Sequence, residues 1–104
     1  MLALTVRAPK AAEIVAGTKR IENRSWRPRA LERIAIHEGG PGGGVIGTVG
    51  LLGVVTPEEA LALMPSQAEH ISGPLCWILI EPRAIARVLC PGRLRLWQAP
   101  ATVQ

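Results

Sequence analysis

The sequence contains no aspartate, phenylalanine or tyrosine, and only two of its 104 residues are cysteines. Three tryptophans are its only aromatic residues, so the core must be built mainly from Leu, Ile, Val and Ala side chains. Cys76 and Cys90 form no CxxC pair, and together with His37 and His70 they lack the spacing of a zinc finger. We therefore expect no metal site in this chain.

Long hydrophobic runs are also missing. The longest apolar run, Val45 to Val55, has 11 residues, which is well short of the ~20 that a membrane-spanning helix requires. Arg7, Lys10 and Glu13 interrupt the opening segment, which therefore does not have the form of a signal peptide. These absences predict a cytoplasmic protein without membrane attachment, in which both cysteines are reduced and buried.

A glycine-rich segment matches a nucleotide-cofactor fingerprint in spacing alone. Gly42, Gly44 and Gly47 fit the pattern G-x-G-x-x-G, which holds a pyrophosphate at the N-terminus of the helix that follows it. Here the following run is rich in β-branched residues and predicts a strand instead. We therefore expect no bound cofactor.

The eleven glycines and nine prolines favour short strands joined by turns over a helical bundle. A short helix is expected from Pro9 to a left-handed cap at Gly17, and a second from a capping box of Thr56 and Glu59. Glycines inside the run 45–55 predict the bulges of a curved strand. Segments of extended or strand character fall at 2–6, 19–23, 33–37, 45–55, 75–80, 84–90 and 94–97.

This spacing of elements defines the expected fold class. It predicts one domain over residues 1–104, mainly β with short helices (α+β), in which about six strands form a curled sheet or a β-barrel. The tail after Pro100 is expected to fray.

Positive charge is concentrated in the first third of the chain. Residues 1–33 hold eight basic and three acidic side chains, whereas residues 34–104 hold four basic and five acidic ones. A basic surface on one side of a small domain suits a partner that carries phosphate, such as RNA. The alternative is an ordinary solvated face on a protein with a pI near 10.0.

The segment from Gly17 to Trp26 is the strongest candidate for a binding site. On a strand, Arg20, Glu22 and Arg24 share one face, where the carboxylate would hold the two guanidiniums in place. Lys19 joins them only if it lies in the turn before the strand. Such a face can contact phosphate through its arginines and a base edge through Glu22. The alternative is an exposed strand with surface salt bridges, which contribute little.

Trp26 lies in the sequence Arg24-Ser-Trp-Arg27-Pro-Arg, where an indole among arginines suits base stacking. It could equally cover the core as a lid. Trp77 and Trp97 lie within apolar strands and are expected in the core. His37 ends a predicted strand, as a structural polar residue or as part of the binding site.

The order of these motifs resembles the ASCH domain family, whose name abbreviates activating signal cointegrator homology and which belongs to the PUA-like superfamily. The most specific feature is Gly17-x-Lys19-x-x-Glu22-x-Arg24 after a short helix. The resemblance spans nearly the whole chain and includes the segments Leu4-Thr-Val-Arg7, Ser25-Trp26, Ile36-His37, Gly73-Pro74-x-Cys76-Trp77 and 92–97.

The resemblance implies a PUA-like barrel with a cleft lined by Lys19, Glu22 and Arg24, and a role connected with RNA or nucleotides. Some ASCH proteins are amidohydrolases that deacetylate N4-acetylcytidine with a lysine, a threonine and a glutamate. Lys19 matches that lysine, but Glu22 stands where the threonine would be. Ribonuclease activity is also attributed to some members.

Three functions follow as hypotheses. In the first, the domain binds RNA or a modified nucleoside through a basic cleft formed by Lys19, Arg20, Glu22, Arg24, Trp26, Arg27 and His37. In the second, it hydrolyses RNA or a nucleoside amide, with Lys19 stabilising an oxyanion and Glu22 or His37 acting as general base toward water. In the third, the basic face binds an acidic protein. Oligomeric state is not predictable from this sequence.

Overall fold

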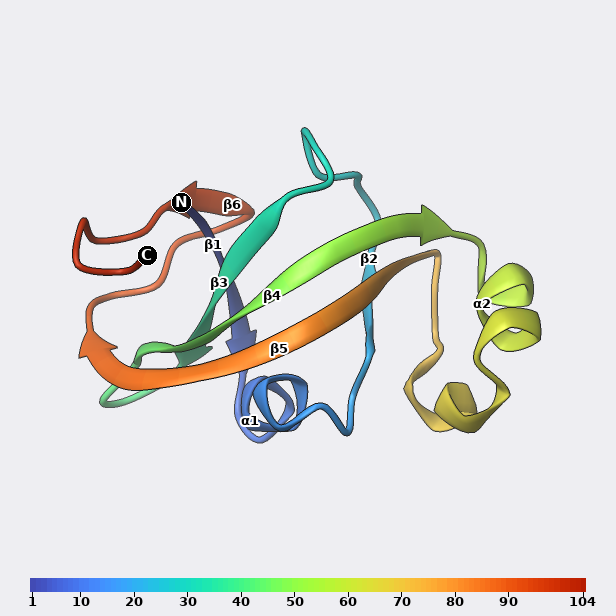
Figure 1. The fold of residues 1–104 in the computed structure, drawn as a ribbon, viewed down its shortest axis with the longest axis horizontal. Coiled ribbons are helices and arrows are strands. Elements are labelled where there is room, and N and C mark those ends of the chain that lie inside the picture. Colours follow the sequence, from blue (N-terminus) through green and yellow to red (C-terminus); the bar gives the residue numbers. More distant parts are fainter.

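Six strands form a single mixed sheet in the computed structural model, which describes all 104 residues (Figure 1). The strands are β1 (Leu2–Arg7), β2 (Ile21–Arg24), β3 (Arg33–Gly39), β4 (Gly44–Val55), β5 (Leu75–Leu89) and β6 (Leu96–Gln98). Their order across the sheet is β2-β5-β4-β3-β1-β6. Only β1 and β3 run parallel; the other neighbours are antiparallel.

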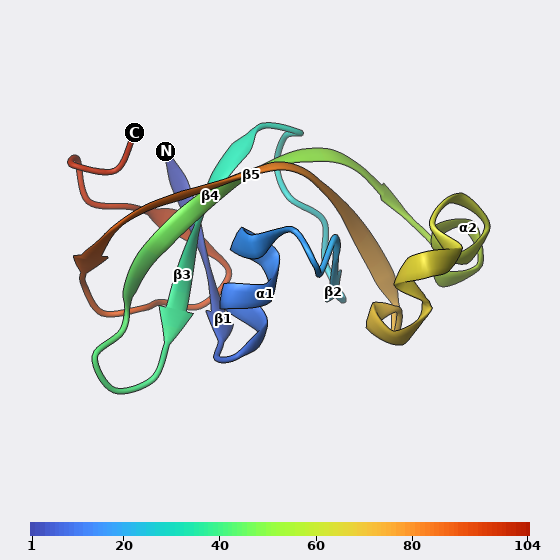
Figure 2. The same ribbon diagram turned by 60° about the horizontal axis from the view of Figure 1, so that its bottom comes forward.

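The sheet curls into a half-barrel (Figure 2). The barrel does not close, because the edge strands β2 and β6 do not pair with each other. Three register shifts between β4 and β5 accompany the curvature, and each falls beside Gly47, Gly50 or Gly53 of β4. The prediction that these glycines mark bulges in a curved strand is therefore confirmed, as is the mainly β class with short helices.

Strand β5 differs from the prediction of two strands at 75–80 and 84–90. It is one continuous strand, and it stays paired to β4 on both sides of Pro82. Proline lacks a backbone N–H and suggests a break in the sequence. Here a register shift between Ile80 and Arg83, with Glu81 at a positive φ of 49°, takes up the irregularity.

The helices begin and end close to where they are expected. Helix α1 (Lys10–Ala16) ends at Gly17, which is left-handed with a φ of 87°. Helix α2 (Pro57–Leu63) begins with the predicted capping box, in which Thr56 and Glu59 each accept from the other's backbone N–H. The polar link after it contains a 3-10 helix, η1 (Pro65–His70), that the sequence did not suggest.

Helix α1 lies beneath the arch of β4 and β5 and fills the concave face of the sheet (Figure 2). Its buried residues Ala11 and Ile14 join the main core, which also contains the fully buried Trp77. Side chains alternate between the two faces of the central strands, and this core contains Leu4, Val6, Ile34 and Ile36.

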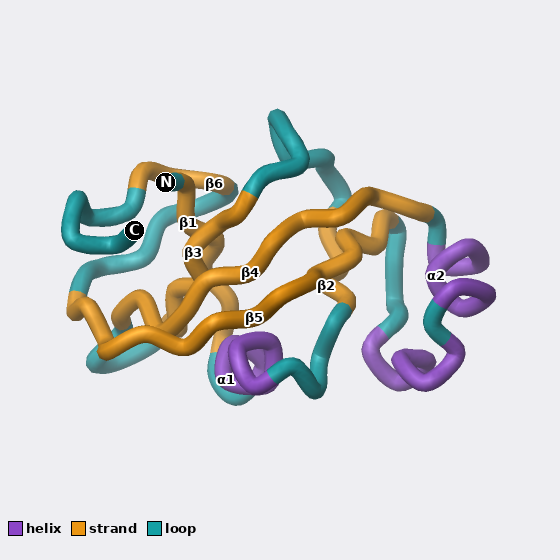
Figure 3. Tube along the Cα trace, in the orientation of Figure 1, coloured by secondary structure: helices purple, strands orange, loops and turns teal.

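The intervening residues Ala3 and Ala35 face a second core on the opposite side of the sheet, around Trp97. Both tryptophans are therefore core residues, as predicted. Val103 is also buried there, so the C-terminal tail packs against the sheet and does not fray; the two termini lie together at the β6 end (Figure 3). No helix is long and apolar enough to span a membrane.

The two cysteines occupy different environments. Both are free, but only Cys76 is fully buried; Cys90 is half-buried, which corrects the expectation that both lie in the core. Burial raises the pKa of the Cys76 thiol, the direction expected for a structural thiol.

Close approach of α1 to the sheet depends on Gly47. A Cβ there would lie 2.6 Å from the carbonyl oxygen of Arg83 and 2.7 Å from the Val15 methyl groups. We expect Gly47→Ala to lower the free energy of unfolding by about 2 kcal/mol, since overpacking forces backbone shifts. Gly53→Ala is the matched control, because a Cβ at Gly53 meets nothing within 4 Å. Urea unfolding followed by tryptophan fluorescence measures both, and equal effects would contradict this role of Gly47.

Candidate functional site

A buried ion cluster lies at the start of β2. The two carboxylate oxygens of Glu22 bind different cations: Oε1 lies 3.4 Å from Lys19 Nζ, and Oε2 accepts from Arg24 Nε at 2.8 Å. Arg24 Nη2 also donates to the carbonyl oxygen of Thr5 on β1, at 3.1 Å. Lys19 and Glu22 are only 3% and 6% exposed. The cluster therefore carries one net positive charge in a poorly solvated place.

Lys19 reaches Glu22 because β2 begins two residues later than predicted. It lies in the turn after α1, where its backbone N–H donates to the carbonyl oxygen of Glu13, and its ammonium also donates to the carbonyl oxygen of Ile21. Ile21 is fully buried, as the predicted alternation requires. The cations that hold Glu22 are thus Lys19 and Arg24, not the predicted pair Arg20 and Arg24.

Arg20 and Arg27 are exposed and belong to different surroundings. The backbone N–H of Arg20 donates to Gln67 Oε1 at 2.7 Å, so this residue ties the turn to η1. Neither arginine lines the cavity at the ion cluster.

The ion cluster forms one wall of a cavity of about 750 Å³, which we name the Lys19 cleft. Four basic side chains and one acidic side chain line it, so its lining carries an excess of three positive charges. Two of the basic residues, Arg7 and Lys10, are exposed and were not assigned to a site from the sequence, because nothing marks them beyond the charge excess of residues 1–33. The lining consists of Thr5, Val6, Arg7, Ala8, Lys10, Lys19, Glu22, Asn23, Arg24, Gly39, Gly40, Ser72 and Gly73.

Burial lowers the pKa of the Lys19 ammonium below its ordinary value of 10.5, and the Glu22 carboxylate offsets part of that shift. The cleft contains one serine, Ser72, and no histidine or cysteine. No group of three His, Cys, Asp or Glu residues is placed to hold a metal ion.

Trp26 is half-buried against the core. Its ring meets Trp77 edge to face with centroids 4.9 Å apart, and its carbonyl oxygen accepts the Trp77 indole N–H. The guanidinium of Arg95 lies over the ring at 4.4 Å. This is the lid position that the sequence allowed, and a base can stack on the face of Trp26 that Arg95 covers only if Arg95 moves aside.

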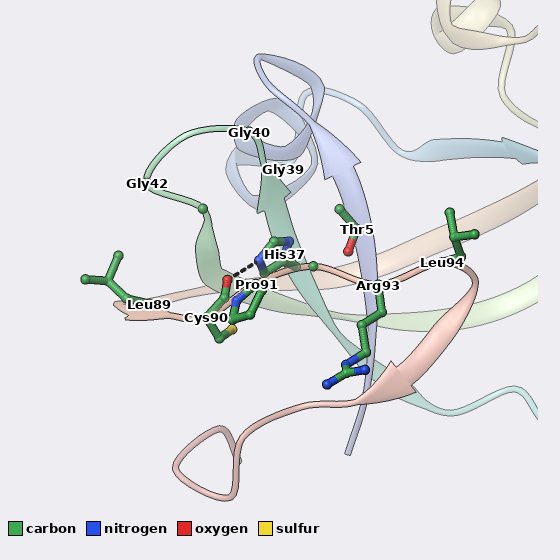
Figure 4. Close-up of a pocket in the computed structure, with 12 residues that line it drawn as sticks. Thr5, His37, Gly39, Gly40, Gly42, Leu89, Cys90, Pro91, Arg93 and Leu94 are labelled. Carbon is green, nitrogen blue, oxygen red and sulfur yellow. Dashed lines mark hydrogen bonds between the residues drawn. The ribbon is translucent and has the colours of Figure 1, made fainter.

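His37 lines a separate cavity of about 840 Å³, which we name the His37 pocket (Figure 4). It adjoins the Lys19 cleft, because Thr5, Gly39 and Gly40 line both. The remaining lining consists of Gly42, Gly43, Leu89, Cys90, Pro91, Gly92, Arg93 and Leu94.

The family model of the ASCH domain matches residues 4–88, and the chain belongs to this family. No curated protein matches the chain significantly.

Crystal structures of ASCH from Zymomonas mobilis share the fold. The unsubstituted protein is 22% identical and aligns over 85% of this chain and 72% of its own, with a TM-score of 0.68. A tyrosine-to-phenylalanine mutant and a serine-to-alanine mutant of that protein are each 21% identical to this chain. They cover the same 85% of this chain and 74% and 72% of their own, and also give TM-scores of 0.68.

Removing the Glu22 charge tests the ion cluster. We expect Glu22→Gln to lower the free energy of unfolding by about 3 kcal/mol, because Lys19 is then left as a buried cation without a counter-charge. Glu38→Gln is the control, since it breaks the more exposed pair with Arg87 and is expected to cost at most about 1 kcal/mol. Similar losses in urea unfolding would show that the cluster is not effectively buried.

The lowered pKa of Lys19 can be measured directly, because Lys10 is the only other lysine in the chain. In Lys10→Arg with ¹³Cε-labelled lysine, we expect the remaining NMR signal to titrate with a midpoint below 10.5. Since the unfolded chain binds this proton more tightly, Lys19 makes the free energy of unfolding rise with pH between its lowered pKa and 10.5. A midpoint at or above 10.5 would contradict the desolvation of this ammonium.

Proposed function

We propose that this ASCH domain binds RNA or a nucleotide, with the phosphate in the Lys19 cleft. The observation that carries the proposal is the excess of three positive charges in one cavity, with cations both on its rim and at its ion cluster. A concave site lined by one sign of charge concentrates ligands of the opposite sign.

Arg7 and Lys10 stand on the rim, exposed and without a hydrogen-bonded partner, so they can meet phosphate at little cost in desolvation. Arg24 is a more directional donor. Its Nε and Nη2 bind Glu22 and Thr5, whereas Nη1 makes no hydrogen bond within the chain. Glu22 thereby fixes the plane of the guanidinium that faces a ligand.

A hydrolase remains the second candidate, favoured by one observation. Lys19, the match to the lysine of amidohydrolase members, has a lowered pKa and still lies beside Glu22. In this alternative its ammonium would stabilise an oxyanion while water attacks. Turnover of N4-acetylcytidine or of short RNA that is lost in Lys19→Met supports it; equal product formation with and without the protein contradicts it.

Salt dependence of RNA binding tests the binding proposal. We expect a fluorescein-labelled single-stranded RNA to bind with an affinity that falls as salt rises. Replacing Arg7 and Lys10 by alanine should weaken binding and flatten the slope of log K against log salt by about 1.4, since each phosphate contact contributes about 0.7 on a single strand. Fluorescence anisotropy at several salt concentrations gives both quantities.

Arg83→Ala is the matched control, because Arg83 is exposed on β5, lies outside the Lys19 cleft and carries the same charge. Its slope should stay close to that of the unchanged protein. If Arg83→Ala removes half as much of the slope as the double variant does, attraction to net charge explains the binding and the cleft assignment is wrong.

A further inference from the structure

One nitrogen of the His37 ring is hydrogen-bonded, and the other has no hydrogen-bond partner. Nε2 lies 2.7 Å from the carbonyl oxygen of Cys90 (Figure 4). Since a carbonyl can only accept, Nε2 carries the proton and Nδ1 presents a lone pair. His37 is 1% exposed, and its Nδ1 is the one buried side-chain nitrogen or oxygen in the protein that lacks a hydrogen-bond partner. Such a group calls for an explanation, because leaving it unpaired costs free energy.

A second polar group lies on the same side of the ring. Thr5 Oγ1 accepts the indole N–H of Trp97 at 3.1 Å, which leaves the hydroxyl hydrogen of Thr5 free to donate. A Cβ built on Gly92 would lie 2.8 Å from Thr5 Oγ1 and 3.0 Å from His37 Nδ1, so both atoms lie directly beneath the Gly92 backbone. The protein thus offers a neighbouring acceptor and donor to one ligand edge.

The rest of the His37 pocket suits a flat, mostly apolar ligand. Gly40 and Gly42 have open space where a side chain would be, so a ring can approach the backbone closely. Leu89 and Leu94, 72% and 92% exposed, are two of the few large apolar side chains left on the surface, and both line this pocket. An apolar lining with a few placed polar groups is typical of small-molecule sites.

We propose that the His37 pocket binds the base of a nucleotide whose phosphate lies in the Lys19 cleft. This inference rests on the proposed function. The two cavities share Thr5, Gly39 and Gly40, so one ligand can occupy both. A nucleobase edge presents an N–H beside a carbonyl oxygen or ring nitrogen. The N–H donates to His37 Nδ1, and the neighbouring atom accepts from the Thr5 hydroxyl.

Access to Nδ1 requires the segment from Pro91 to Arg93 to move away from the ring far enough to admit a base edge, because the nitrogen is closed off in the structure. Nothing in the backbone opposes this movement: residues 91–95 make no backbone hydrogen bond. Gly92 lets the segment lie this close to the ring, since a Cβ there would lie 2.8 Å from His37 Cε1 and from Thr5 Oγ1.

The test compares uridine 5′-monophosphate with ribose 5-phosphate, which lacks the base, by calorimetric titration. We expect the nucleotide to bind at least tenfold more tightly. His37→Gln keeps a donor for the Cys90 carbonyl but removes Nδ1, and it should weaken nucleotide binding about tenfold while leaving ribose 5-phosphate unchanged. His70→Gln, at the only other histidine, is the control and should change neither.

NMR gives a direct readout that a merely structural histidine would not produce. In ¹⁵N-labelled His70→Gln the single remaining histidine should show a protonated Nε2 and an unprotonated Nδ1, and the Nδ1 signal should move when the nucleotide binds but not when ribose 5-phosphate binds. If His37→Gln does not fold, Leu94→Ser replaces it. Leu94 is almost fully exposed, so this variant keeps the fold and should weaken only nucleotide binding.

The outcomes separate the two proposals. If both ligands bind equally and neither His37→Gln nor Leu94→Ser changes this, the base site is wrong while the phosphate cleft stands. If nucleotide binding depends on His37 but not on Arg7 and Lys10, the base site stands and the phosphate cleft is wrong. If neither ligand binds and the Nδ1 signal never moves, both are overturned.

Discussion

The placement of Glu22 between Lys19 and Arg24 is the constraint on which the candidate site depends. A lysine that is 3% exposed is stable as a cation only with a counter-charge nearby, and the Glu22 carboxylate is the acidic group that lies beside it. The same carboxylate orients Arg24, which in turn binds the Thr5 carbonyl oxygen and ties β2 to β1. Arg24, held in place by Glu22, thus links two strands that are not neighbours in the sheet.

The curvature of the sheet brings those strands together. In the order β2-β5-β4-β3-β1-β6, three strands separate β2 from β1, so a flat sheet would hold them far apart. The bulges of β4 and the insertion of α1 under the arch close that distance, and Gly47 lets the helix approach. The glycines of β4 therefore allow the sheet to curve, and the cluster of Lys19, Glu22 and Arg24 links β2 to β1 across the open side of the half-barrel.

Much of this arrangement could be predicted from local patterns. Capping signals located both helices, alternation located most strands, and glycine spacing indicated the curvature. Predictions of strand ends and of the C-terminal tail were wrong where a local signal had a second interpretation. Pro82 suggested a break, although a bulge in β5 keeps pairing on both sides of it. The tail after Pro100 lacks strong signals, yet Val103 packs against the second core.

The site was harder to predict because its members are close in space and not in sequence. Lys19, Glu22 and Arg24 could be grouped from a short segment. Arg20 was grouped with Glu22 and Arg24 because the predicted strand began at residue 19, whereas β2 begins at Ile21. Thr5 and Arg7 reach the cleft from β1, and Lys10 reaches it from the start of α1. No periodicity within the chain indicates that β1 will lie opposite β2.

Thr5 shows most clearly how the fold joins two environments. Its carbonyl oxygen faces the cleft and accepts from Arg24, whereas its hydroxyl group accepts from Trp97 beside His37. Thr5 therefore lines both cavities and contacts a residue of each. A buried ion cluster adds little net stability compared with a well-packed apolar alternative, and an unpaired buried imidazole nitrogen costs stability outright. Both features lie on either side of the same threonine, in neighbouring cavities, and this shared location favours a common ligand over two unrelated imperfections of packing.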